Sequence, residues 1–134
     1  ALEDASETAD AVDYLNAHGT STPMNDLSET NAIKEVFGDR AYGMAVSSTK
    51  SQMGHLIAAA GAVEGIICAL AIERSTAPMT ANLTTPDPEC DLDYVTEGCR
   101  SMQIDTAMSN SFGFGGSNSC LVFRSRGRAE SRDT

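Results

Sequence analysis

The segment from His55 to Arg74 constrains the fold of this chain more than any other part of the sequence. It is rich in alanine and apolar nearly all round, so most of its surface needs to be covered by protein or lipid. Glu64 lies in its middle, close to Gly61 and Gly65, and the apolar stretches on either side are far shorter than the ~18 residues of a membrane span. We therefore predict a buried central helix over 55–74 and no membrane span.

Shorter strand and helix signals alternate around this segment. The pattern predicts strands over 12–17 and 44–48. It also predicts a helix that begins at Pro23, with Thr22 as its N-cap, and ends at Gly38. Three prolines mark an extended loop after the central helix. Further short strands are predicted near 92–96, 104–110 and 119–124. This order predicts an α/β fold in which helices cover a mixed sheet of the five-stranded type.

The length of 134 residues suits one domain or one lobe of a larger domain. Nine basic residues stand against nineteen acidic ones, and the net charge of −10 argues against nucleic acid or an anionic membrane as the main partner. We expect one compact unit over 1–123, followed by a basic tail over 124–134 that is disordered and solvated.

The four cysteines show no CxxC spacing and are too few for a disulfide scaffold. We interpret them as reduced thiols, most of them small structural residues, in a cytosolic or organellar-stroma type of compartment. They are Cys68, Cys90, Cys99 and Cys120.

The two histidines, His18 and His55, each follow a strand-like segment in a turn that contains glycine. The carboxyl ends of neighbouring parallel strands meet at one edge of a sheet, so we expect the two imidazoles to lie together. A single histidine is more often structural, but a pair of neutral imidazoles can donate to a carbonyl oxygen that is becoming an enolate. A metal site formed with Asp26 and Glu64 has no familiar ligand spacing to support it.

Lys50 is one of only two lysines and precedes the apolar segment. It reads either as a surface residue or as an orienting charge paired with Asp26 or Glu64. Glu64 needs such a partner, because an unpaired buried carboxylate is costly.

A glycine-rich segment spans 110–118. It lacks the GxGxxG pattern, and a strand follows it instead of a helix, so it is not a dinucleotide-binding loop. Two interpretations stay open. It is an ordinary tight turn between strands, or a flexible loop whose backbone N–H groups face an oxyanion while Phe112 or Phe114 gates a pocket.

Three motifs together resemble the C-terminal half of the β-ketoacyl-[acyl-carrier-protein] synthases. They are Asn-Ala-His18-Gly-Thr-Ser-Thr-Pro, Ser-Ser-Thr-Lys50-Ser-x-x-Gly-His55 and Asn110-Ser-Phe-Gly-Phe-Gly-Gly. The resemblance covers about residues 1–123 and is nearest to the type II enzymes of dissociated fatty-acid synthesis. Modular polyketide ketosynthases more often have Gly-Thr-Gly-Thr where this chain has Gly-Thr-Ser-Thr. The resemblance implies a thiolase-like fold, of which this chain is the C-terminal half.

The activity implied by the resemblance is a decarboxylative Claisen condensation. A cysteine takes the growing acyl chain from acyl carrier protein, malonyl-carrier protein loses CO2, and the resulting carbanion attacks the acyl thioester. No metal or dissociable cofactor is implied, because the phosphopantetheine thiol arrives on the carrier protein. The complete enzyme is expected to be a homodimer.

The resemblance also implies roles for individual residues. His18 and His55 are the catalytic histidines that bind the malonyl thioester carbonyl, and Lys50 is the active-site lysine tied to Asp26 and Glu64. The resemblance implies that Thr20 and Thr22 contact the phosphopantetheine arm. It also implies that Phe114 is the gate and that its backbone N–H helps to form the oxyanion hole, with Phe112 beside it. Met53 departs from the pattern, since the family usually has threonine there.

The larger departure is the nucleophilic cysteine, which the family carries in its N-terminal half and which none of the four cysteines here matches. We therefore expect the chain to be inactive without a cysteine-bearing half. The chain is also expected to begin within a helix that precedes 12–17. A non-catalytic, chain-length-setting partner subunit, a truncated remnant and a polyketide ketosynthase fragment are the alternatives.

Overall fold

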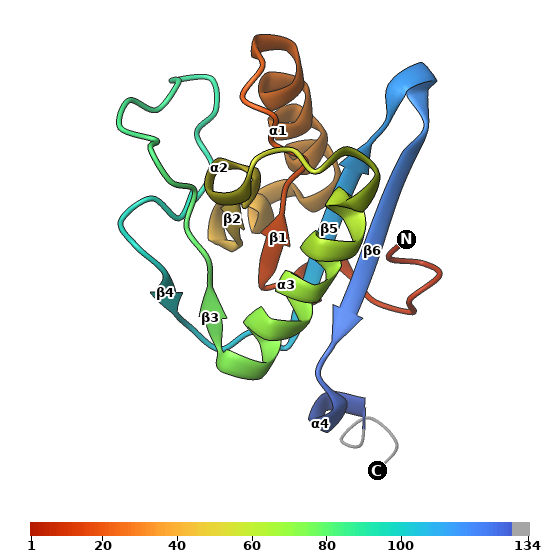
Figure 1. Cartoon of the computed structure of the whole chain (residues 1–134). Coiled ribbons are helices and arrows are strands. Elements are labelled where there is room, and N and C mark those ends of the chain that lie inside the picture. The colour runs from red at the N-terminus through yellow and green to blue at the C-terminus, as the bar shows by residue number, and fades with distance from the viewer. Residues whose placement is uncertain (130–134) are drawn as a thin grey trace.

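The computed structural model describes residues 1–129, and a mixed four-stranded sheet forms its centre (Figure 1). Strand β1 (Tyr14–Asn16) pairs in parallel with β2 (Ala45–Ser47) on one side and with β5 (Thr106–Phe112) on the other. The edge strand β6 (Asn118–Arg124) runs antiparallel to β5. The order β2-β1-β5-β6 therefore brings the carboxyl ends of three parallel strands to one edge.

Two helices cover opposite faces of this sheet: α1 (Pro23–Phe37) and α3 (Ala60–Arg74) (Figure 1). The strand side chains alternate between the two faces, as the pleat requires. In β1, Tyr14 belongs to the core on the α3 side and Leu15 to the core on the α1 side. The predicted α/β architecture, with helices on a mixed sheet, is confirmed.

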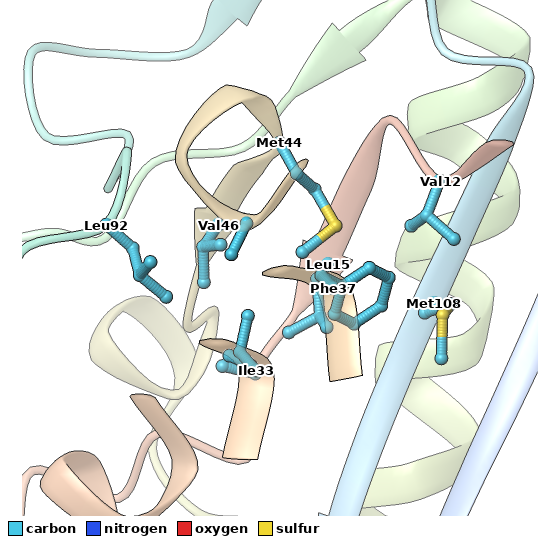
Figure 2. Packing of buried hydrophobic residues seen from close by; sticks show 10 residues of the cluster. Val12, Leu15, Ile33, Phe37, Met44, Val46, Leu92 and Met108 are labelled. Atoms are coloured by element: carbon cyan, nitrogen blue, oxygen red, sulfur yellow. The ribbon is translucent and has the colours of Figure 1, made fainter. Parts of the chain in front are cut away.

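The core on the α1 side is built from larger aliphatic and aromatic residues. Figure 2 shows Ile33 and Phe37 from α1 directed toward Leu15, Val46 and Met44. Ile33 and Phe37 are four positions apart, so they lie on one face of the helix. The helix ends after Phe37, where Gly38 takes a φ of +54° that favours glycine. The bounds predicted for this helix are confirmed.

The core on the α3 side depends on small residues of the helix. Cys68 and Ala71 are buried against Tyr14 and Ala107 of the sheet. A Cβ at position 65 would lie 3.1 Å from the Phe123 ring, which is why glycine fits there. Small side chains let the helix approach the sheet closely.

The predicted central helix is shorter and less buried than expected. α3 begins only at Ala60, after a 3₁₀ turn, η3 (Ile57–Ala59), and a loop that carries His55. Only one face of α3 is covered, and Ile66 on the other face is 60% exposed. Within residues 1–129, no helix is long and apolar enough to cross a bilayer.

The segment predicted as a strand over 92–96 contributes only a single bridge, between Tyr94 and Val46. The sheet therefore has four strands where five were expected. Two short elements escaped prediction: a second sheet, in which β3 (Thr76–Ala77) pairs with β4 (Arg100–Ser101), and the one-turn helix α2 (Lys50–Met53). Such short elements depend on distant partners, so their local sequence carries little signal.

The two ends of the described chain also differ from expectation. Residues 2–6 form turns instead of a helix, and η1 (Ala9–Ala11) follows them. Arg124, placed in the tail by sequence, ends β6 and pairs with Glu7, and 126–129 forms the short helix α4 (Arg126–Ala129). The rest of the predicted disordered tail, 130–134, lies outside the described residues. Two further 3₁₀ segments are η2 (Gly38–Gly43) and η4 (Phe114–Gly116).

Candidate functional site

The two histidine turns lie side by side at the carboxyl edge of the sheet. His18 follows β1, while α2 and His55 follow β2, and these two strands are parallel neighbours. The imidazole centroids are 5.6 Å apart with the rings at 86°. Phe112, at the end of β5, contributes a third ring 5.3 Å from that of His18. The structure thus brings together three side chains that are separated by up to 94 residues.

Lys50 is held by a buried ion pair. Its Nζ donates to Glu64 Oε1, which reaches it from α3, and both side chains are almost wholly enclosed. Asp26, the other predicted partner, does not contact it. The Asp26 carboxylate instead accepts hydrogen bonds from the Ser21 N–H at 3.2 Å and from Asn25 Nδ2 at 3.1 Å. Of the two partners expected for Lys50, the structure selects Glu64.

The environment of His18 favours a neutral imidazole. Burial lowers its pKa below the ordinary histidine value, and the positive charge of Lys50 lowers it further. His18 Nδ1 is buried without a hydrogen-bond partner among the residues described. A neutral ring still carries one N–H group, which can donate to a developing oxyanion.

Glu29 is a member of the site that sequence analysis missed. The side chain is buried on α1, and its Oε1 accepts the backbone N–H of His18 while Oε2 accepts that of Gly19, both at 2.9 Å. Its Oε1 also accepts Asn110 Nδ2 from β5 at 3.1 Å. One carboxylate therefore fixes the His18 turn to the next strand. Its position four residues before Ile33, on the buried face of α1, was the available signal.

The glycine-rich segment is the turn of the β5–β6 hairpin. The Gly113 N–H donates to the Ser117 carbonyl oxygen at 2.7 Å, and Gly115 and Gly116 take φ values of +77° and +80°. Phe114 projects fully into solvent, at 103% relative exposure, so it does not cover the imidazoles in this conformation. Its role as a gate stays a prediction, whereas Phe112 contacts His18 directly.

A cleft of about 670 Å³ opens beside the histidines. It is lined by the start of α1, by Lys50 and His55, and by a wall of residues within 80–94. Thr20 and Thr22 line the cleft, and their hydroxyls share a hydrogen bond of 3.0 Å, while their contact with a phosphopantetheine arm stays a prediction. Thr22 occupies the cap position of α1 without making a side-chain cap. The volume suits a small organic group.

The cysteines of the described chain are all free thiols. Cys68 is buried in α3, donates to the Met108 carbonyl oxygen at 3.4 Å and has its pKa raised to about 12 by burial. Burial also raises the pKa of Cys120, and Cys99 is exposed in a loop. Cys90 lines the cleft. None lies at a strand-to-helix turn with its thiol at the start of a helix, which is the setting expected of the nucleophile.

Among the side chains that the structure describes, those of residues 1–127, no group of three or more His, Cys, Asp or Glu is placed to hold a metal ion. In particular, the tentative metal set of the two histidines with Asp26 and Glu64 does not assemble, since Glu64 is engaged by Lys50 and Asp26 by the turn before α1.

Comparison with known proteins gives a consistent result. Residues 1–84 match the C-terminal domain of the beta-ketoacyl synthases. The chain is 60% identical over 121 residues to 3-oxoacyl-[acyl-carrier-protein] synthase 2 of Coxiella burnetii, covering 90% of this chain and 29% of that protein. It is 53% identical over 123 residues to nodulation protein E of Rhizobium meliloti, covering 92% of this chain and 31% of the other. It thus spans less than a third of these relatives.

The solved structures that superpose on this chain are ketosynthases as well. A type II polyketide ketosynthase in complex with its acyl carrier protein superposes with a TM-score of 0.90 at 46% identity, over 93% of this chain and 31% of that one. The ishigamide ketosynthase/chain length factor superposes with a TM-score of 0.89 at 37% identity, over 93% of this chain and 30% of that one. The described chain therefore has the fold of the corresponding part of these ketosynthases.

Proposed function

Because this chain belongs to the β-ketoacyl synthase family and forms part of its C-terminal domain, we propose that it carries the decarboxylating half of a 3-oxoacyl-[acyl-carrier-protein] synthase of fatty-acid elongation. The observation that carries the proposal is the pair of adjacent imidazoles, His18 and His55, at the carboxyl edge of the sheet. Glu29 holds the first of them through the backbone.

The chemistry needs a place where negative charge is stabilised. The substrate is a malonyl thioester, and breaking its C–CO2 bond releases CO2 and leaves the bonding electrons on an enolate. His18 and His55 donate N–H groups to the thioester oxygen as this charge develops. The pKa of His18 lies below the ordinary value, so this ring keeps one N–H and one bare nitrogen at neutral pH.

The second half of the reaction forms the carbon–carbon bond. The enolate carbon attacks the carbonyl of an acyl group held as a thioester on a cysteine, and the cysteine thiolate leaves. The product is a 3-oxoacyl thioester, two carbons longer, on the carrier protein. Lys50, paired with Glu64, supplies fixed positive charge beside the imidazoles.

The nucleophilic cysteine is proposed to lie in another segment of the complete protein. The four thiols of this chain lack the required setting, and the relatives are more than three times as long as the matched region. The exposed apolar face of α3, centred on Ile66, is the surface that such a segment would cover.

Acyl carrier protein is the proposed partner, since a ketosynthase of the same fold has been solved with one. The carrier supplies the phosphopantetheine thiol, which enters the cleft past Thr20 and Thr22, and Phe114 gates it. The complete enzyme is proposed to be a homodimer that needs no other cofactor. The bacterial relatives and the free thiols favour a cytoplasmic or stroma-type compartment.

The decisive experiment compares His55→Ala with the wild type in the complete synthase, using malonyl-carrier protein as substrate. We expect His55→Ala to abolish CO2 release, while Glu35→Ala, on the exposed face of α1, leaves it unchanged. An unchanged decarboxylation rate in His55→Ala would remove the role assigned to this histidine.

A second experiment separates this function from a non-catalytic role as a chain-length-setting partner or a remnant. The 134-residue chain alone is expected to form no 3-oxoacyl product. Condensation should appear when a cysteine-bearing half is supplied. Product formation by the isolated chain would refute the divided site, and failure of the combined halves would favour the non-catalytic interpretation.

A further inference from the structure

The two histidine turns come from different strands, so something must fix the distance between them. Asn16 at the end of β1 bonds Thr49 after β2, and Ser48, the residue after β2, makes a second side-chain connection that reaches the residue next to His18. Its Oγ donates to the Gly19 carbonyl oxygen at 2.7 Å, and Gly19 is the residue next to His18. Ser48 itself lies two residues before Lys50. A single buried hydroxyl therefore joins the turn that bears His18 to the turn that bears Lys50 and His55.

The contact between these turns leaves no free space. A Cβ at Gly19 would lie 2.5 Å from the Ser48 Cβ and 2.7 Å from its Oγ, and Gly19 has a φ of +40°. Only a residue without a side chain can occupy this position. The first turn therefore rests on the Ser48 side chain itself, and the separation of the turns depends on that side chain.

The backbone of Ser48 is held as firmly as its hydroxyl. Its N–H donates to Thr80 Oγ1 at 3.0 Å, and its carbonyl oxygen accepts the Ser51 hydroxyl at 2.7 Å. The Ser51 hydroxyl in turn accepts the Ala81 N–H at 2.8 Å. These contacts anchor Ser48 to the 80–94 wall of the cleft, so it can act as a fixed support for Gly19.

We propose that Ser48 is a positioning residue, which sets the distance between His18 and His55 by bonding Gly19 and thereby supports their joint action on one thioester oxygen. The proposal rests on the proposed function. The Ser48 hydroxyl donates to the backbone of the His18 turn, at Gly19, and so would act on the histidines through the backbone. A shift of the turn by a fraction of an ångström alters the simultaneous hydrogen bonds that two donors make to one acceptor.

The chain offers a matched control in the preceding residue. Ser47 is also buried, but its hydroxyl bonds the Tyr14 hydroxyl at 2.9 Å in the core on the α3 side of the sheet. Ser47→Ala and Ser48→Ala each delete one buried hydroxyl from adjacent positions. If the hydroxyls only stabilise the fold, both variants should lose activity to a similar extent. If Ser48 positions the histidines, only Ser48→Ala should lose activity.

The test uses the complete synthase and two readouts. In Ser48→Ala we expect kcat for malonyl decarboxylation to fall about tenfold with KM nearly unchanged, as the loss of one hydrogen bond predicts. In Ser47→Ala we expect a change below about twofold. Ser48→Cys, which keeps the volume but donates weakly, should lie between wild type and Ser48→Ala, and it serves as the test if Ser48→Ala does not fold.

The second readout is the pKa of the His18 imidazole, followed by NMR with labelled histidine. The charged groups that act on this ring are Lys50 on α2, His55 in the loop before α3, Glu64 on α3 and Asp26 on α1. Loosening the turn admits water and increases the distance to Lys50, so the pKa should rise toward the ordinary value in Ser48→Ala and stay in place in Ser47→Ala.

The two readouts separate the possible failures. Equal rate losses in the two alanine variants, or an unmoved His18 pKa in Ser48→Ala, would overturn the positioning role. If wild type itself releases no CO2, the proposed function fails, and the NMR comparison still decides whether Ser48 positions His18.

Discussion

Lys50 Nζ on α2 donates to Glu64 Oε1 on α3, 14 residues further along the chain, and the two side chains are only 5% and 2% exposed. The pair explains how a carboxylate can lie in an apolar helix and how a lysine can lie beside two imidazoles. Each charge depends on the other, because neither has water to replace its partner.

Glu64→Gln is therefore expected to destabilise the protein by about 3 kcal/mol, since it leaves the Lys50 charge buried and unpaired. Urea unfolding measures the loss. Glu35→Gln, on the exposed face of α1, is the control and should change stability by less than about 0.5 kcal/mol. The double variant Lys50→Met/Glu64→Leu should be more stable than Glu64→Gln. Similar losses in both single variants would show that the ion pair contributes little.

Glu29→Gln should loosen the turn that carries His18. Glutamine keeps one acceptor oxygen but turns its NH2 group toward the other backbone N–H. One of the two donors, the N–H of His18 or that of Gly19, therefore loses its partner, which should lower the free energy of unfolding by about 2 kcal/mol. Amide hydrogen exchange should accelerate at His18 and Gly19 while the strands stay protected. Glu35→Gln on the exposed face of α1 should change neither measurement. Unaltered exchange at both amides would show that Glu29 does not hold the turn.

The lowered pKa of His18 predicts a dependence of stability on pH. Between this lowered value and the ordinary histidine value, the unfolded chain binds a proton at His18 and the native chain does not. The neutral ring therefore makes its full contribution to the free energy of unfolding when the pH is above the ordinary histidine pKa. This contribution falls as the pH decreases through the window between the two pKa values. Urea unfolding from about pH 7.5 to 5 should show a smaller fall in His18→Asn than in wild type. Identical slopes would contradict a lowered pKa.

The exposed face of α3 should behave as an interface in the complete protein. Ile66→Asp is expected to lower the thermal midpoint by more than about 5 °C, because it places an unpaired carboxylate against the segment proposed to cover α3. Val36→Asp on α1 is the matched control, since Val36 is 59% and Ile66 60% exposed in this chain. Its midpoint should move by less than about 2 °C. If both variants lower the midpoint equally, Ile66 has no special partner.

Much of the architecture was predictable because the signals are local. Pro23 and Gly38 mark the two ends of α1 by their own backbone preferences, and the structure places the helix between them. The parallel arrangement of the strands before His18 and His55 followed from the alternation of strands and helices. The adjacency of the imidazoles is a geometric consequence of that arrangement.

The predictions of secondary structure failed where pairing with a residue distant in the sequence decides whether a segment is a strand or a helix. Residues 92–96 look like a strand but pair with β2 only through Tyr94, and β3 and β4 are strands only because each finds the other. The helix predicted over 55–74 begins at Ala60, since the segment that carries His55 turns toward His18.

The amino-acid sequence was sufficient to predict the fold class and the family and to propose which side chains carry the chemistry, because periodicity, turn residues and motifs are properties of neighbouring positions. Tertiary structure alone decided that Lys50 pairs with Glu64 and not with Asp26, that Glu29 holds the His18 turn, and that Ser48 supports Gly19. Those choices are made by distances between residues remote in the chain, and they are set only when the strands and helices pack together.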